Sequence, residues 1–207
     1  MTYPHRRIKI PLMKKIILAS SSPRRREILA AAGINFEVIP SETEENISAD
    51  SPEELVRGLS LLKCSDVAKK AGGGFIVIGA DTIVVHDGKI MGKPKDGTDA
   101  FNMLRSLCGD THAVYTGVTV IDTDSGKEMT FHERCEVKMY DVSNDAIRKY
   151  IETGEPMDKA GAYAIQGRGA FLVERINGDF YTVMGLPIAR LMKVLYEDFA
   201  LKWEALS

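Results

Sequence analysis

A short segment near the N-terminus has residue types that bind phosphate. Residues 19–25 read Ala-Ser-Ser-Ser-Pro-Arg-Arg, between an apolar run that predicts a buried strand and a predicted helix with Ser22 as its cap. The free N–H groups and positive dipole end of such a helix favour an anion, and hydroxyl and guanidinium groups add donors for phosphate oxygens. We therefore expect Ser20, Ser22, Arg24 and Arg25 to bind substrate phosphates. The alternative is that the serines only cap the helix and the arginines form a solvated helix face.

An acidic residue follows the most apolar strand that the sequence predicts. Residues 75–79 form this strand, and Asp81 and Thr82 come directly after it. Catalytic groups of α/β folds gather at the carboxyl ends of such strands, and a buried carboxylate is costly unless it is paired or binds a metal. We expect Asp81 to be catalytic, and the alternative is a structural aspartate that caps a turn. Lys93, in a Gly-Lys-Pro sequence, is a further cation on a stiff backbone.

Two other polar segments can complete a nucleotide site. Residues 155–167 combine acids, a lysine and an amide with glycines, whose permissive backbone can approach a ligand closely. Gln166 both donates and accepts hydrogen bonds through its amide, so it can read the edge of a base. Glu44 and Glu45 lie in an acidic loop, and carboxylate oxygens suit Mg²⁺ or Mn²⁺. The alternative for the longer segment is an ordinary loop.

The composition excludes several other classes of protein. The chain has 207 residues, 44% of them hydrophobic, which suits one globular domain with two lobes around a cleft. A net charge of -2 gives no long-range attraction to nucleic acid or to an anionic membrane. Three cysteines without a Cys-x-x-Cys pair indicate neither a disulfide framework nor a thiolate zinc site. The four histidines show no metal spacing and no partnering nucleophile, so none is given a role.

The N-terminal residues do not resemble a targeting segment. Residues 1–12 are basic and lack the apolar stretch and cleavage site of a secretory signal. No apolar run approaches the roughly 18–20 residues that a membrane span needs. We expect a poorly ordered extension over residues 1–13, with Met1 or Met13 as the natural start, and a single catalytic domain over residues 14–207 in the cytoplasm.

Strands and helices alternate along the chain in a pattern that predicts a mixed, twisted α/β sheet flanked by helices. Capping residues and prolines predict where the helices begin, and Gly-containing turns such as Asp87-Gly88 predict hairpins. The expected strands are residues 15–19, 35–40, 75–79 with an extended continuation at 83–85, 113–121 and 127–140. The expected helices begin at Pro23, Ser51, Asp96 or Thr98, Ser143 and Pro187, and a last hairpin is expected to turn at Asn177-Gly178.

These motifs, taken together and in order, resemble the Maf family of nucleoside triphosphate pyrophosphatases. They are Ser-x-Ser-Pro-Arg-Arg at 20–25, Gly-Ala-Asp-Thr at 79–82, Gly-Lys-Pro at 92–94, the segment at 155–167 and Gly-Leu-Pro at 185–187. Each motif is weak alone, but the ordered set covers the chain from Lys14 to about Leu195. The resemblance implies an elongated, two-lobed α/β fold similar to that of the inosine triphosphate pyrophosphatases.

The resemblance also implies an activity and roles for particular residues. Family members release pyrophosphate from nucleotides with a divalent metal, Mg²⁺ or Mn²⁺, and are often homodimers. Asp81 matches the family's proposed proton acceptor and, with Glu45, would hold the metal. Arg24, Thr82 and Gln166 match positions linked to substrate choice. Further polar residues of the family's cleft are matched by Arg25, Glu45, Lys63 and Lys93.

The form of one motif implies the substrate. Ala-Tyr-Ala-Ile-Gln-Gly at 162–167 looks like the subgroup that hydrolyses dTTP and UTP to the monophosphate and pyrophosphate. The alternatives are a 7-methyl-GTP or inosine-type pyrophosphatase, and a non-catalytic nucleotide-binding regulator of septum formation. A nucleic-acid binder is disfavoured, because no basic stripe is interleaved with aromatic residues.

Overall fold

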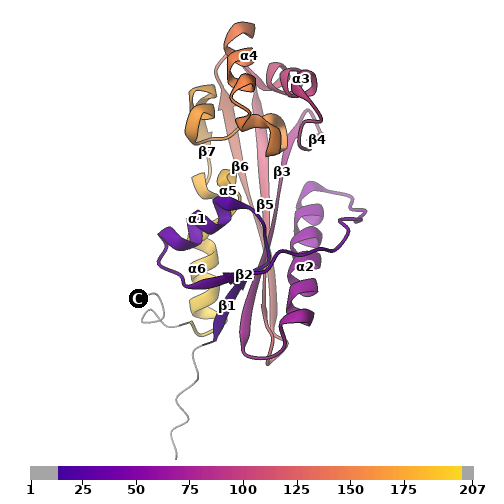
Figure 1. The fold of residues 1–207 in the computed structure, drawn as a ribbon, viewed down its shortest axis with the longest axis vertical. Coiled ribbons are helices and arrows are strands. Elements are labelled where there is room, and N and C mark those ends of the chain that lie inside the picture. The colour runs from indigo at the N-terminus through magenta and orange to yellow at the C-terminus, as the bar shows by residue number, and fades with distance from the viewer. Residues whose placement is uncertain (1–13, 202–207) are drawn as a thin grey trace, which may run out of the picture.

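The computed structural model describes residues 14–201 of the chain. It is an elongated α/β structure with a single mixed sheet, in which the strand order is β2-β1-β3-β5-β6-β7 and β4 pairs with β3 (Figure 1). The predicted fold class, a mixed sheet flanked by helices, is confirmed. The predicted extension over residues 1–13 lies outside the described residues.

Three long antiparallel strands run through the whole length of the molecule. They are β3 (Phe75–His86), β5 (Thr111–Asp122) and β6 (Glu128–Met139). The shorter strands lie beside them: β1 (Lys15–Leu18) pairs in parallel with β2 (Phe36–Val38) and β3, while β4 (Lys89–Met91) and β7 (Val173–Asn177) pair antiparallel with β3 and β6.

Helices cover the sheet differently in its two halves (Figure 1). In the half that contains β1, helix α2 (Pro52–Ala71) covers one face, while α1 (Pro23–Ala31) and α6 (Ile188–Glu197) cover the other. In the other half lie α3 (Gly97–Leu107) and α4 (Asn144–Glu152). The segment that follows α4 forms three short 3₁₀ helices, Glu155–Asp158, Ala160–Ala162 and Gly167–Leu172, and α5 (Phe180–Met184) precedes α6.

Most of the predicted turns and caps are present. Ser51, Asp96 and Ser143 each accept a hydrogen bond from a backbone N–H in the first turn of the following helix. Asp87 and Gly88, both at positive φ, form the tight turn between β3 and β4.

Two local predictions are wrong. Ser22 stands at the N-cap position of α1 but makes no capping hydrogen bond among the described residues, and Pro23 alone marks the helix start. Asn177-Gly178 does not turn a hairpin, because Asp179 caps α5 and the chain enters a helix instead of a strand.

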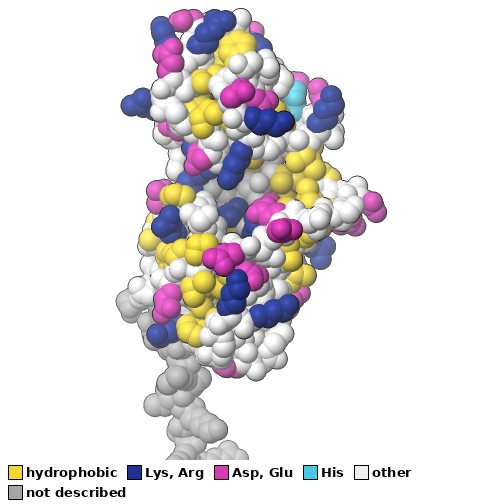
Figure 2. All heavy atoms as spheres, turned by 45° about the vertical axis from the view of Figure 1, so that its right-hand side comes forward, with side chains coloured by type: hydrophobic (Ala, Val, Ile, Leu, Met, Phe, Trp, Pro, Cys, Tyr) yellow, Lys and Arg dark blue, Asp and Glu magenta, His cyan; other side chains and the backbone are white. Residues whose placement is uncertain are grey.

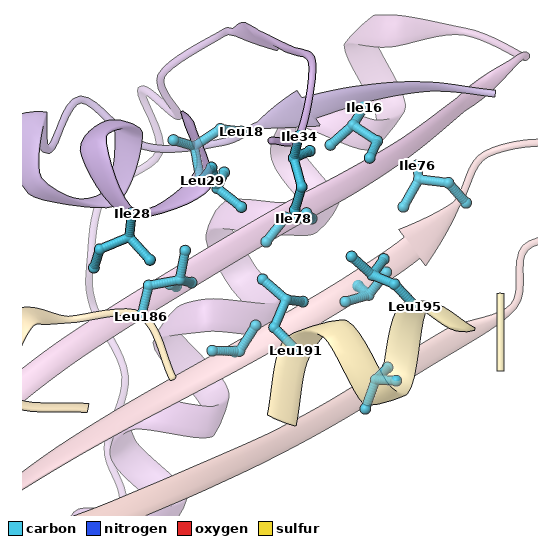
Figure 3. Close-up of a cluster of buried hydrophobic side chains, with 14 of the residues drawn as sticks. Ile16, Leu18, Ile28, Leu29, Ile34, Ile76, Ile78, Leu186, Leu191 and Leu195 are labelled. Atoms are coloured by element: carbon cyan, nitrogen blue, oxygen red, sulfur yellow. The ribbon is translucent and has the colours of Figure 1, made fainter. Parts of the chain in front are cut away.

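The hydrophobic core has two main parts, one in each half. Even-numbered residues of β1 and β3, such as Ile16, Leu18 and Ile78, pack with α1 and α6 in the first part (Figure 3). The second part lies around Val84 and Val114, under α3 and α4. Because successive side chains of a strand point to opposite faces, the odd-numbered residues of the same strands pack against α2.

One edge of β3 is left open in the middle of the molecule. β1 pairs with β3 only as far as Ile78, and β4 begins to pair at Val84, while β5 pairs with β3 throughout. The sequence had predicted that Asp81 follows the end of a strand, and this is wrong. Asp81 lies in the middle of a 12-residue strand. The strand that does end beside this open stretch is β1. Its last pairing with β3 is at Ile78, and the chain continues from its carboxyl end toward Ser20.

Helix α2 packs unusually close to β3 and β5 because two glycines face it. A Cβ at Gly117 would lie 2.2 Å from the carbonyl oxygen of Val56, and one at Gly79 would lie 2.6 Å from that of Ser60. Gly117 is the cross-strand partner of Asp81. The close approach thus fixes α2 beside the open stretch of β3.

We predict that Gly117→Ala destabilises the protein by about 1–3 kcal/mol or more, because the added methyl group meets backbone that cannot move aside. Urea or thermal unfolding measures the loss. Gly92→Ala is the matched control, since a Cβ at Gly92 would meet nothing within 4 Å. Equal stability of the two variants would show that α2 does not need this close contact.

Candidate active site

A cavity of about 780 Å³ opens between the two halves of the molecule, at the open edge of β3. In Figure 2 it is a hollow with basic and acidic side chains around it. Its volume lies within the range of small-molecule sites. Five cationic and three acidic side chains line it, so its charge balance favours an anion.

The cavity brings together most of the residues that the sequence singled out. They come from the β1–α1 junction, the segment before α2, α2 itself, β3 and the segment after β4. These lining residues are Ser20, Ser22, Arg24, Arg25, Glu45, Lys63, Asp81, Thr82 and Lys93. Gln166 is not among the described residues that line the cavity, although its neighbour Ile165 is.

The open edge explains how neighbouring residues with opposite orientations reach one cavity. Asp81 points to the face covered by α2, where it meets Lys63, and Thr82 points to the other face, where it meets Arg25. In a strand paired on both sides these side chains would be separated by the sheet. Here the cavity extends around the unpaired edge and takes in both.

Asp81 and Glu45 share one cation. The Nζ atom of Lys63 lies 2.6 Å from Oδ1 of Asp81 and 2.8 Å from Oε1 of Glu45. The side chains of Lys63 and Asp81 are only 15% and 11% exposed, so this pair lies in a largely desolvated place, while Glu45 is about half exposed. Lys63 offsets the cost of burying the Asp81 carboxylate.

Arg25 is clamped by three acceptors. Its Nε donates to the carbonyl oxygen of Gly185 at 2.8 Å, and its two terminal nitrogens donate to Ser20 Oγ and Thr82 Oγ1, both at 3.0 Å. Burial lowers the pKa of Arg25, which Asp81 partly offsets, but a guanidinium remains charged at neutral pH. Each terminal nitrogen keeps one further N–H for an anion in the cavity.

A chain of hydrogen-bonded hydroxyl groups extends from Arg25, and the groups at its two ends fix which hydroxyl donates to which. Thr82 Oγ1 lies 3.0 Å from Thr116 Oγ1, and Thr116 donates to the carbonyl oxygen of Thr182 at 2.7 Å. Because a guanidinium can only donate and a carbonyl can only accept, Thr82 must donate to Thr116. Thr82 therefore has no proton left to offer a ligand and acts mainly to hold Arg25.

Ser20, in contrast to Thr82, keeps a hydroxyl proton that it can donate to a ligand. Its Oγ accepts from Arg25 and from the backbone N–H of Ser22, so both lone pairs are engaged. Its O–H is then available as a donor, and Ser20 lines the cavity. This arrangement suits a phosphate oxygen, which accepts but does not donate.

Two further cations of the cavity have no hydrogen-bond or ion-pair partner in the described structure, although Arg24 lies near enough to Asp158 to lower the pKa of that carboxyl. Arg24 and Lys93 line the cavity, and within residues 14–201 neither makes a side-chain hydrogen bond or an ion pair. Both charges are therefore available to a ligand. Gly92, beside Lys93, accepts a hydrogen bond from the N–H of Gly161, which ties this cation to the other wall of the cavity.

A buried polar cluster shapes the segment that carries Gln166. The Glu155 carboxylate accepts hydrogen bonds from Tyr150 Oη and from the N–H groups of Arg168 and Gly169, and the N–H of Ala164 donates to Tyr150 Oη. Burial acts against it, but these hydrogen bonds lower the pKa of Glu155. Burial, and then Glu155, raise the pKa of Tyr150. The cluster holds the backbone on both sides of Gln166.

Some residues of the cavity carried no predicted role. Asp158, Lys159 and Tyr163 line it, and all three fall within the segment 155–167 that the sequence had marked as unusual. Thr116 carried no sequence signal, because only the pairing of β3 with β5 places it opposite Thr82.

One group of side chains within residues 14–201 has the spacing of a metal site. Atoms of His86, Asp87 and Asp110 that can bind a metal lie within 4.8 Å of one another, and His86 Nε2 is 3.0 Å from Asp110 Oδ2. The hydrogen bond from His86 lowers the pKa of Asp110. None of the three lines the cavity among the described residues.

Within residues 14–201, no helix is both long and apolar enough to cross a bilayer.

Comparisons with known proteins agree with the motifs. The model of the family described as Maf-like protein matches residues 15–198. A dTTP/UTP pyrophosphatase of Bacillus cytotoxicus is 52% identical over 184 residues, which are 88% of this chain and 95% of that protein. One of Alkaliphilus metalliredigens is 50% identical over 188 residues, 90% of this chain and 97% of that protein. The solved structure of the Staphylococcus aureus Ham1 protein is 15% identical, with a TM-score of 0.45, over 62% of this chain and 73% of that one.

We predict that Thr116→Val weakens binding of inorganic triphosphate about fivefold to tenfold, because Thr82 loses its acceptor and no longer holds Arg25 firmly. Isothermal titration measures the affinity. The control is Thr119→Val, which removes an equally buried hydroxyl from the same strand, one bonded to Ser60 and Thr130 outside the cavity. Both variants should lose stability, but a loss of affinity in both would mean that the hydroxyl chain has no special link to the anion site.

Proposed function

The chain belongs to the Maf family, and we propose that it hydrolyses dTTP and UTP to the nucleoside monophosphate and pyrophosphate. The observation that carries this proposal is a largely buried carboxylate, Asp81, beside a lysine in a cavity that is rich in cations. The relatives named dTTP/UTP pyrophosphatase, matched over nearly their whole length, support the substrate. An oxygen of water bonds to the α-phosphorus, and the bond from that phosphorus to the bridging oxygen of pyrophosphate breaks.

The phosphates would bind at the junction of β1 and α1. Phosphoryl transfer requires mainly positioning and neutralisation of charge. Arg24 and Lys93 supply charges that no hydrogen bond or ion pair engages in the described structure, Arg25 offers two fixed N–H groups, and Ser20 offers its hydroxyl proton. On the opposite wall, Lys159 is already ion-paired with Asp158, with 2.6 Å between Nζ and Oδ1.

Glu45 and Asp81 would hold a divalent cation, Mg²⁺ or Mn²⁺. Their oxygen donors suit these hard metals, and both carboxylates already contact one cationic group, the Lys63 ammonium. When bound, the metal would neutralise phosphate charge and favour ionisation of water. Lys63 contacts Oδ1 of Asp81, so Oδ2 is the oxygen that would orient the attacking water and take its proton.

The base would lie toward the segment 155–167, the wall opposite the arginines. Tyr163 and Ile165 line the cavity there, and Gln166 is the next residue. Uracil and thymine present carbonyl, N–H and carbonyl groups along one edge, which an amide can pair in part. Cytoplasmic location and homodimer formation remain predictions. The alternatives to the proposed activity are a preference for 7-methyl-GTP or an inosine nucleotide, and a non-catalytic role in the regulation of septum formation.

The test of the function is release of pyrophosphate from a panel of nucleoside triphosphates with Mg²⁺ or Mn²⁺, and then with a chelator. We expect metal-dependent turnover with a clear preference for dTTP and UTP. Preference for 7-methyl-GTP or for inosine triphosphate would change the assigned substrate. Tight nucleotide binding without turnover of any nucleotide would favour the regulatory binding protein over the enzyme.

We predict that Asp81→Asn lowers kcat about 10²–10⁴-fold, because the amide keeps the shape of the side chain but cannot accept the proton of water. Steady-state kinetics with the preferred nucleotide measures the effect. Asp87→Asn is the control, since Asp87 is an exposed turn residue of positive φ that asparagine tolerates well. Near-normal turnover by Asp81→Asn would remove Asp81 from the catalytic role.

A further inference from the structure

The Lys63 ammonium lies where two carboxylates converge. Asp81 and Glu45 approach the same nitrogen at 2.6 and 2.8 Å, from β3 and from the segment before α2. Carboxylate oxygens are donors that Mg²⁺ and Mn²⁺ prefer, so these two carboxylates could hold a divalent cation in place of the ammonium. The Lys63 ammonium therefore occupies the place where the two carboxylates would hold such a cation.

The metal and the ammonium exclude each other from this position. Two carboxylates neutralise one divalent cation, whereas the same carboxylates with one ammonium keep a net negative charge. A second positive charge in contact with a bound metal would be repelled strongly, because the Asp81 and Lys63 side chains are largely shielded from water.

The elements around the pair allow Lys63 to leave without disturbing the fold. Its backbone belongs to α2, which Gly79 and Gly117 hold against the sheet, so only the flexible four-carbon side chain needs to move. Lys63 lines the same cavity as Arg25 and Lys93, so a displaced ammonium would remain within reach of an anion there.

We propose that Lys63 is an exchangeable counter-cation, which holds Asp81 and Glu45 together without metal and is displaced into the cavity when a divalent cation binds. The displaced ammonium then binds the triphosphate. This inference rests on the proposed function for the metal position. Because each ligand favours the state in which Lys63 has left the carboxylates, metal and triphosphate promote each other's binding.

The first test measures binding of Mn²⁺ alone, without nucleotide, by the loss of the free-ion signal in electron paramagnetic resonance. Lys63→Met keeps the length of the side chain and removes its charge, so it should tighten Mn²⁺ binding about tenfold or more. Lys93→Met is the matched control for the loss of one positive charge from the cavity, and it should change the affinity much less.

Two acid variants locate the ion in the same assay. Glu45→Gln should weaken Mn²⁺ binding, whereas Asp110→Asn should not, because Asp110 belongs to the separate group with His86 and Asp87. If Asp110→Asn abolishes binding and Glu45→Gln does not, the metal lies elsewhere and the proposal is overturned.

A second test uses the unaltered protein and follows Lys63 directly. Acylation of individual lysines, quantified by mass spectrometry, should be slow at Lys63 without metal and several-fold faster with saturating Mg²⁺, while Lys93 stays constant. The proposal fails if Lys63→Met binds Mn²⁺ no more tightly than Lys93→Met, or if Mg²⁺ leaves the labelling of Lys63 unchanged. Neither measurement depends on turnover, so failure here and failure of the proposed activity can be told apart.

Discussion

The site depends on the stretch of β3 between Ile78 and Val84, where one edge of the strand has no pairing partner. β5 pairs with β3 along this stretch and holds it in the sheet, while β1 has ended and β4 has not begun on the other edge. Consecutive residues, Asp81 and Thr82, can therefore serve one cavity from opposite faces of the sheet. A fully paired strand would bury one of them away from the other, and a free loop would not fix either.

The packing around this stretch divides the site into two functional sides. On one face, glycines at 79 and 117 bring α2 close enough for Lys63 to reach Asp81 and Glu45. On the other face, Arg25 is held through hydroxyl groups and the carbonyl of Gly185. Gly185 has a φ of 106°, and a Cβ added there would lie 3.2 Å from Thr82 Oγ1, so a side chain has little room. The first side is suited to metal and water, the second to phosphate.

The wall of the cavity formed by the segment after α4 is held in place differently from the strands and helices of the other walls. The segment after α4 contains only short 3₁₀ turns, and its shape is held by hydrogen bonds to Glu155 and Tyr150. The order of this wall therefore depends on side-chain hydrogen bonds and not on a regular helix or strand.

Local chemistry determined much of this protein from the sequence alone. Caps at Ser51, Asp96 and Ser143, the Asp87-Gly88 turn and the apolar strands depend on near neighbours, and they predicted the α/β class. The short motifs, and the family resemblance that they carry, predicted most of the charged residues of the cavity. Only the tertiary structure decided that Asp81 lies within a strand, that Thr116 supports Arg25 and that Lys63 bridges two carboxylates. Strand register and helix packing set these contacts between residues far apart in the chain, and no local pattern encodes them.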